Sequence, residues 1–60
     1  MTAFDKALDY FEGDPIAALR WFTSPCWTFY GETPNRHSAT PEGEREVIEL
    51  LTKLEYGVPI

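Results

Sequence analysis

The sequence predicts an all-α fold, a small bundle of two short helices, one or two single-turn helices and a longer C-terminal helix. Apolar residues recur at helical spacing in three segments, and a polar cap followed by proline recurs three times. The segment with the highest strand propensity, residues 26–30, has no partner strand. Sixty residues allow only one hydrophobic core, so we expect residues 1–60 to form a single helical domain.

The first helix is marked at both ends. Thr2 followed three positions later by Asp5 resembles a capping box, in which each side chain satisfies a backbone amide of the other residue. Gly13 suits the left-handed conformation with which many helices end. Between these signals, one apolar stripe recurs at i, i+4 and i+7: Phe4, Leu8 and Phe11.

The second helix begins at Asp14-Pro15, because aspartate accepts hydrogen bonds from free amides and proline fits the first helical position. It should end near residues 23–25. Its predicted apolar stripe consists of Ile16, Leu19 and Phe22, with Trp21 beside it and expected to pack in the core.

The middle of the chain predicts two short turns of helix. Residues 26–30 are bounded by Pro25 and Gly31, which favours a single helical turn over a strand. Thr33-Pro34 repeats the cap-and-proline pattern and predicts a short helix through Ser38.

The last helix is predicted from Thr40-Pro41 to Gly57, with glutamates in its early turns where the helix dipole favours negative charge. Gly43 projects on the same side as the leucines, which indicates close approach of another backbone. The predicted core stripe comprises Val47, Leu50, Leu51 and Leu54, widened by Ile48.

Composition argues against several classes of partner. The net charge is −5, and the five basic residues are scattered, so direct nucleic-acid binding is not expected. No apolar run approaches the roughly 20 residues of a membrane span, so no membrane partner is expected. Cys26 is the only cysteine, which favours a reducing, cytoplasmic setting.

Catalytic chemistry is not expected either. One histidine and one cysteine cannot supply a zinc site, and the four isolated glycines form no phosphate loop. A small enzyme using Cys26 and His37 is the remaining catalytic hypothesis. We favour the simpler interpretation, in which Cys26 is a small buried residue and His37 a surface residue, with no cofactor and no metal.

Six motifs occur in an order that resembles a known family. They are Phe11 to Pro15, Ala18 to Phe22, Ser24-Pro25, Gly31 to Pro34, Thr40 to Gly43 and Leu54 to Gly57. Together they are similar to the C-terminal toxin-binding domain of Xre/MbcA/ParS-type antitoxins, the partners of RES-domain toxins. The resemblance spans roughly four-fifths of the chain.

The resemblance implies a helical module that binds and neutralises a RES-type toxin, an enzyme that destroys NAD. In such complexes the C-terminal end of the antitoxin approaches or blocks the entrance to the toxin's active site. Carried onto this chain, the implied partner-binding residues are Lys53, Glu55, Tyr56, Gly57, Val58, Pro59 and Ile60.

Two departures from the family pattern leave an alternative open. The family usually places apolar residues at the positions of Asn35 and Ser38, so this short helix is expected to be exposed or used differently. Full-length members carry an N-terminal helix-turn-helix domain, which this sequence lacks. The alternative function is an orphan helical protein-binding adaptor or regulatory fragment without a toxin partner. The oligomeric state is left open, and a homo-oligomer is compatible with the sequence.

Overall fold

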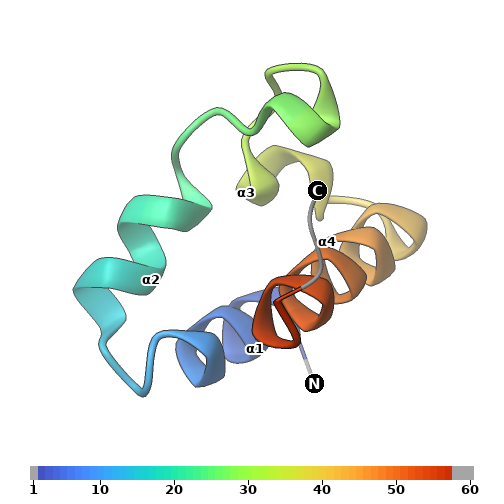
Figure 1. Ribbon diagram of the computed structural model, residues 1–60. Coiled ribbons are helices and arrows are strands. Elements are labelled where there is room, and N and C mark those ends of the chain that lie inside the picture. Colours follow the sequence, from blue (N-terminus) through green and yellow to red (C-terminus); the bar gives the residue numbers. More distant parts are fainter. Residues whose placement is uncertain (1, 58–60) are drawn as a thin grey trace.

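The computed structural model describes residues 2–57 and contains helices separated by short turns (Figure 1). The described elements are α1 (Ala3–Tyr10), α2 (Pro15–Phe22), the 3₁₀ turn η1 (Trp27–Phe29), α3 (Pro34–His37) and α4 (Pro41–Glu55). No strand occurs within residues 2–57, which confirms the predicted all-α class and the helical turn at residues 26–30.

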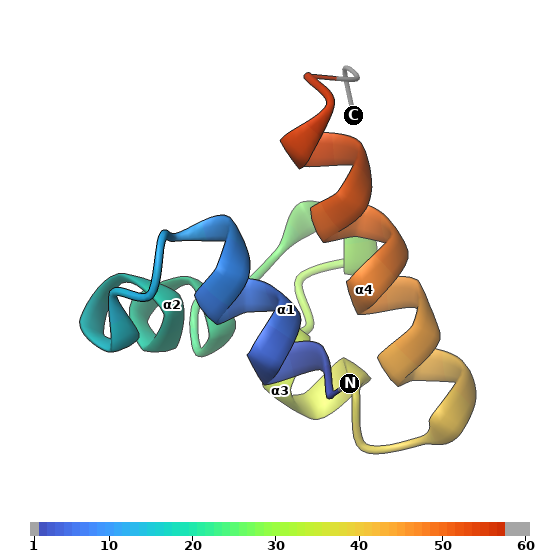
Figure 2. The same cartoon turned by 90° about the horizontal axis from the view of Figure 1, so that it is seen from below.

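Helix α1 packs against both α4 and α2, while η1 and α3 complete the bundle (Figures 1 and 2). Ala3 and Ala7 are almost completely buried, and their small side chains allow the axes of α1 and α4 to lie close together. The backbone N–H of Ala3 also donates to Glu44 Oε2 of α4 at 3.4 Å.

The core is built mainly from α1, α4 and one side of α2. Phe4 and Phe22 connect α1 to α2 through an edge-to-face contact with ring centroids 5.4 Å apart. The predicted α4 stripe is buried at three positions, while Leu54 is half-buried. The buried apolar core residues are Ala3, Ala7, Ala18, Phe22, Phe29, Val47, Leu50 and Leu51.

Side-chain caps begin all four α-helices, as predicted. Thr2 and Asp5 form the reciprocal capping box of α1. Asp14 accepts from two amides at the start of α2, and Thr33 and Thr40 each accept from one amide of α3 and α4. These bonds satisfy amides that have no partner inside the helix.

The end of α1 differs by one residue from the prediction. The left-handed backbone begins at Glu12 (φ 57°) and continues through Gly13 (φ 82°). The Glu12 N–H donates to the Asp9 carbonyl, and the Gly13 N–H donates to the Leu8 carbonyl at 2.7 Å. This pair of bonds is a Schellman motif in which glutamate, rather than glycine, occupies the first left-handed position.

Gly43 lies where another backbone crosses α4, as predicted. A Cβ atom added there would lie 1.7 Å from the His37 carbonyl oxygen and 2.8 Å from its carbonyl carbon. The loop between α3 and α4 can therefore fold tightly onto the first turn of α4 only because this position has no side chain.

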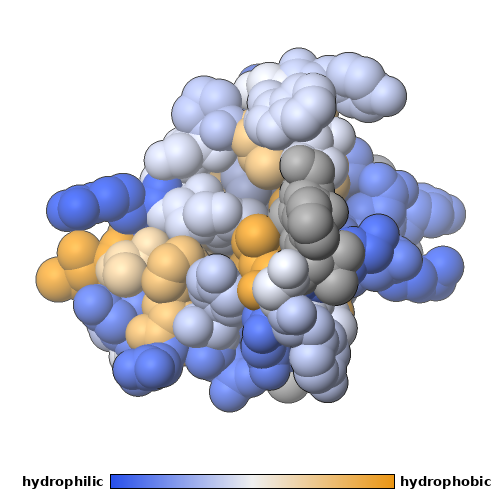
Figure 3. Space-filling model, viewed as in Figure 1, coloured by the Kyte–Doolittle hydropathy of each residue, from blue (hydrophilic) through white to orange (hydrophobic). Residues whose placement is uncertain are grey.

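The predicted apolar stripe of α2 is wrong at two positions. Ile16 is 69% exposed and Leu19 is 54% exposed, whereas Ala18 and Phe22 are buried and Trp21 is half-buried against the core. An apolar patch accordingly lies over α2 on the surface (Figure 3). Helix α2 is apolar on most sides, so periodicity could not identify the side that faces α1.

Candidate functional site

The C-terminal end of α4 carries the predicted partner-binding residues and extends beyond the rest of the bundle (Figure 2). Lys53, Glu55 and Gly57 are exposed, and Tyr56 is 79% exposed. The predicted contacts at Val58, Pro59 and Ile60 lie outside the described residues. The described part of this end therefore presents charged side chains and one large aromatic ring to solvent.

Tyr56 directly follows the last helical residue and acts as the C-cap of α4. Its backbone N–H donates to the Thr52 carbonyl at 3.2 Å, which holds the residue at the helix end. Leu54 packs against the core from the same turn. The last turn thus directs an aliphatic side chain inward and an aromatic ring outward, so Tyr56 belongs to the surface rather than to the core.

An ion pair fixes this end of α4 to the first helix. Lys6 Nζ of α1 lies 2.8 Å from Glu55 Oε2. The hydrogen bond to Glu55 raises the pKa of Lys6. Glu55 is consequently paired with α1, while Lys53 and Tyr56 remain exposed and available for contact with another molecule.

A second polar cluster surrounds His37, which sequence reasoning had placed simply at the surface. Its Nδ1 lies 2.8 Å from Glu32 Oε1 and its Nε2 lies 2.9 Å from Glu46 Oε1. The imidazole also stacks on Phe29, with centroids 4.1 Å apart and an interplanar angle of 11°. His37 therefore connects the turn after η1 to α4.

The partners of His37 favour its charged form. Ionised carboxylates can only accept hydrogen bonds, so both ring nitrogens must donate, as they do in an imidazolium ion. The hydrogen bonds to Glu46 and Glu32 accordingly raise the pKa of His37 above its ordinary value near 6.5.

The hypothesis of a Cys26–His37 nucleophile pair finds no support in this geometry. Cys26 is half-buried beside the core, and both nitrogens of His37 are occupied by carboxylates. No ring nitrogen is therefore free to accept the thiol proton. Across residues 2–57, no group of three or more histidine, cysteine, aspartate or glutamate side chains is placed to bind a metal ion.

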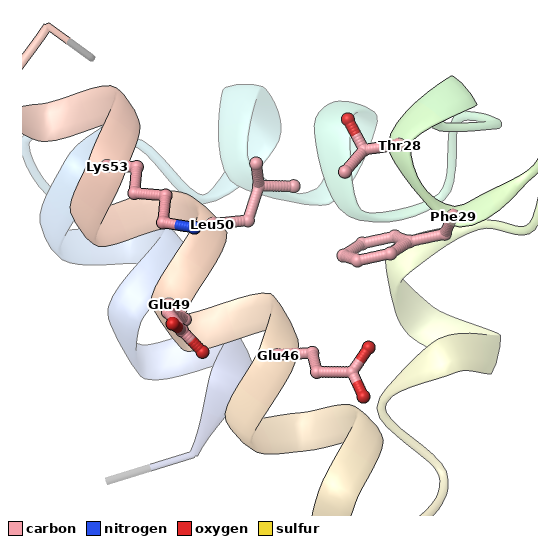
Figure 4. A pocket seen from close by; sticks show the side chains of 6 residues that line it. All are labelled: Thr28, Phe29, Glu46, Glu49, Leu50 and Lys53. Carbon is pink, nitrogen blue, oxygen red and sulfur yellow. The ribbon is translucent and has the colours of Figure 1, made fainter. Parts of the chain in front are cut away.

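An open groove of about 210 Å³ lies between η1 and the part of α4 from Glu46 to Lys53 (Figure 4). Phe29 and Leu50 form its apolar floor, and the side chain of Glu46 points from α4 toward Phe29. We call this depression the α4–η1 groove; its lining residues are Thr28, Phe29, Glu46, Glu49, Leu50 and Lys53. Lys53 is the one predicted site residue that lines it.

Two exposed aromatic residues beside the groove were not identified from the sequence as site residues. Trp27 directly precedes the lining residue Thr28 and is 80% exposed, while Tyr30 directly follows Phe29 and is fully exposed. Tyr30 also has a left-handed backbone (φ 58°), which is unfavourable for a bulky residue. The aromatic density of residues 26–30 was the available signal, but pattern alone could not separate buried Phe29 from its exposed neighbours.

Within the part of the chain that the structure covers, no helix has the length and apolar character needed to cross a bilayer.

Comparison with known proteins gives two findings. Residues 6–57 match the family described as "Antitoxin Xre/MbcA/ParS C-terminal toxin-binding domain". The chain is also 33% identical over 58 residues to "Antitoxin Xre" of Yersinia enterocolitica serotype O:8 / biotype 1B (strain NCTC 13174 / 8081). That alignment covers 97% of this chain and 39% of the relative, so the chain spans about two-fifths of the length of the curated relative.

No solved structure matches the chain. The family match nevertheless runs from Lys6 in α1 through α2, η1 and α3 to the whole of α4, including the exposed end that carries Tyr56. The chain belongs to the C-terminal toxin-binding domain family of the Xre/MbcA/ParS antitoxins.

Proposed function

We propose that this chain neutralises a RES-type, NAD-degrading toxin in the cytoplasm by placing the end of α4 and residues 58–60 at the entrance to the toxin's active site. Membership of a toxin-binding antitoxin family supports a protein toxin as the partner. The observation that carries the proposed binding mode is Tyr56, a large ring left exposed at the projecting end of the longest helix.

The chemistry of this end suits a protein interface. Tyrosine contributes a large apolar surface and one hydroxyl while losing little conformational entropy, and it is enriched among residues that dominate binding energy. Lys53 and Glu55 provide polar groups close to the ring in the sequence. The Lys6–Glu55 pair holds the final turn in place before binding, which reduces the cost of ordering it.

The proposal is tested by co-expressing the chain with a RES-type toxin, sought first in the reading frame beside its gene, and measuring cellular NAD. The unaltered chain should preserve NAD and co-purify with the toxin. Tyr56→Ala should weaken toxin binding at least about tenfold in a calorimetric titration, as expected for a central aromatic contact.

Ile16→Ala is the matched control, since it removes another large exposed side chain from a different helix. It should leave both NAD protection and toxin affinity unchanged, and circular dichroism melts should show that both variants fold. The proposed mechanism would be contradicted if cellular NAD fell although the chain was present in an amount equal to the toxin. It would also be contradicted if Tyr56→Ala bound the toxin with the same affinity as the unaltered chain.

A second candidate, a regulatory adaptor without a toxin partner, is favoured by the exposed polar residue Asn35 on α3, where the family usually has an apolar residue. The two functions differ in their need for the C-terminal end. If the chain blocks a toxin with its C-terminal end, deletion of residues 58–60 should abolish toxin binding. An adaptor that binds through another face should retain its partner after the same deletion.

A further inference from the structure

We propose that the α4–η1 groove receives an arginine side chain of the partner protein. This inference deepens the proposed function and rests on it only for the identity of that partner. The groove runs along α4 from Glu46 to Lys53, so a protein that covers the end of α4 next to Lys53 can also reach it.

The size of the groove suits one side chain rather than a free small molecule. Its volume of about 210 Å³ is below the roughly 300–1,000 Å³ typical of small-molecule pockets. The apolar floor can accommodate an aliphatic stem, because Phe29 and Leu50 expose carbon atoms to the groove (Figure 4). A long side chain with an apolar stem and a polar head matches this lining.

Charge indicates the nature of that head. Two carboxylates, Glu46 and Glu49, line the groove against one ammonium group, Lys53. Glu46 already accepts a hydrogen bond from His37 through Oε1, so Glu49 is the carboxylate we expect to form the main pair with an incoming cation. The net charge of −5 on the whole chain adds a longer-range attraction for a basic partner surface.

Arginine fits these groups better than lysine. Its planar guanidinium can bond a carboxylate through two parallel N–H groups and can also lie against an aromatic ring. Phe29 offers the small exposed part of such a ring to the groove, while one of its faces is covered by the stacked His37. Trp27, exposed on the same 3₁₀ turn, supplies further aromatic surface, and aromatic and arginine side chains are both enriched at protein interfaces.

The first test needs no toxin. The chain is titrated with N-acetyl-arginine amide while backbone amide shifts are followed by nuclear magnetic resonance, and the neutral analogue N-acetyl-citrulline amide is the control. The amide shifts caused by the arginine probe should concentrate at residues 28–29 and 49–50. The shifts caused by the citrulline probe should be at least about threefold smaller, and the Glu49→Gln variant should show no shifts with the arginine probe. Equal responses to the two probes, or shifts absent from these residues, would overturn the proposal.

The second test uses the complex with the RES-type toxin. Glu49→Gln should weaken toxin binding about tenfold at low salt and less at high salt, because a charge-assisted bond is lost. Glu42→Gln, an exposed position on α4 outside the groove, should have no effect. Unchanged affinity of the Glu49 variant would exclude the groove from the interface, whereas arginine binding without any toxin binding would refute the toxin assignment and leave the groove site standing.

Discussion

Helices α2 and α4 start in the same way and are used differently. Each begins with a side-chain cap followed by proline, and each carries aliphatic residues at helical spacing. Helix α4 buries its stripe, including Val47 and Leu51, whereas α2 leaves Ile16 and Leu19 in solvent. The difference shows that a cap and a period define a helix, while its neighbours decide which of its sides becomes core.

The polar faces of the two helices explain part of this difference. Helix α4 alternates its aliphatic stripe with glutamates, so only one side of it can be buried at low cost. Helix α2 has the sequence PIAALRWF, in which Arg20 is the only charged residue. Several orientations of α2 would therefore bury apolar surface, and the Phe4–Phe22 contact selects one of them.

The largest expected effect comes from truncating the same residue type in each helix. Leu51→Ala removes a fully buried side chain from α4 and should cost about 2–5 kcal/mol of unfolding free energy. A core of this size rarely supplies more than about 3–5 kcal/mol, so much of the variant should be unfolded at room temperature.

Leu19→Ala, its counterpart in α2, should change the unfolding free energy by no more than about 0.5 kcal/mol because the side chain is largely in solvent. Urea titrations followed by circular dichroism measure both variants. Similar losses for the two leucines would show that α2 is packed against something else in solution, and the contrast between the helices would fail.

A smaller change in the unfolding free energy is expected at the start of α4, where replacing a helical glycine by alanine should destabilise the fold rather than stabilise it. In an ordinary helix interior Gly→Ala gains about 1 kcal/mol, but the Cβ of Gly43→Ala would collide with the backbone carbonyl of His37. A net loss of about 1–3 kcal/mol is expected, because backbone cannot move aside as a flexible side chain can. Glu42→Ala in the same turn, at an exposed position, should stay within about 0.5 kcal/mol of the parent.

Urea unfolding of these two variants provides the measurement. A stabilised Gly43→Ala variant would mean that the loop between α3 and α4 is looser than described, and that the contrast between a tightly anchored α4 and an open α2 is overstated.

The smallest effect is a pH dependence located at the His37 cluster, on the α4 side of the molecule. The folded state raises the pKa of His37, so it binds the proton more tightly than the unfolded chain does. The stabilisation should be complete below about pH 6.5 and should be lost as pH rises through the raised pKa. Glu32 and Glu46 are partly exposed, so added salt should reduce the effect.

Thermal melts of the parent and of His37→Gln between pH 5.5 and 8.5 check this expectation. The parent should lose stability across this window, and the variant should show a flatter profile. An unchanged slope in the variant would assign the pH dependence to other groups.

Local signals in the sequence were sufficient for most of the fold. The caps at Thr2, Asp14, Thr33 and Thr40 and the close approach at Gly43 were all predictable, because each depends on one residue type meeting one backbone requirement. The left-handed residue Glu12 was not predictable, since the adjacent Gly13 is the better candidate on conformational grounds.

The site was less accessible to sequence reasoning, because it depends on contacts between distant residues. The ion pair of Lys6 with Glu55 joins positions 49 residues apart, and the groove brings Phe29 next to Glu49. The spacing of apolar residues in the sequence predicts neither the ion pair nor the groove. The sequence alone does not show whether Tyr56 belongs to the core or to the surface; in the structure it is exposed, while the neighbouring Leu54 packs against the core.

The Lys6–Glu55 pair has a consequence for engineering this antitoxin domain. It connects the second turn of the first helix to the last residue of the final helix, so the C-terminal end of α4 is tied to the N-terminal helix. Truncation or a fusion at the N-terminus would therefore alter the position of the C-terminal turn of α4. A tag placed there would therefore lie close to the contact that holds Glu55, even though 49 positions separate the two residues of the pair.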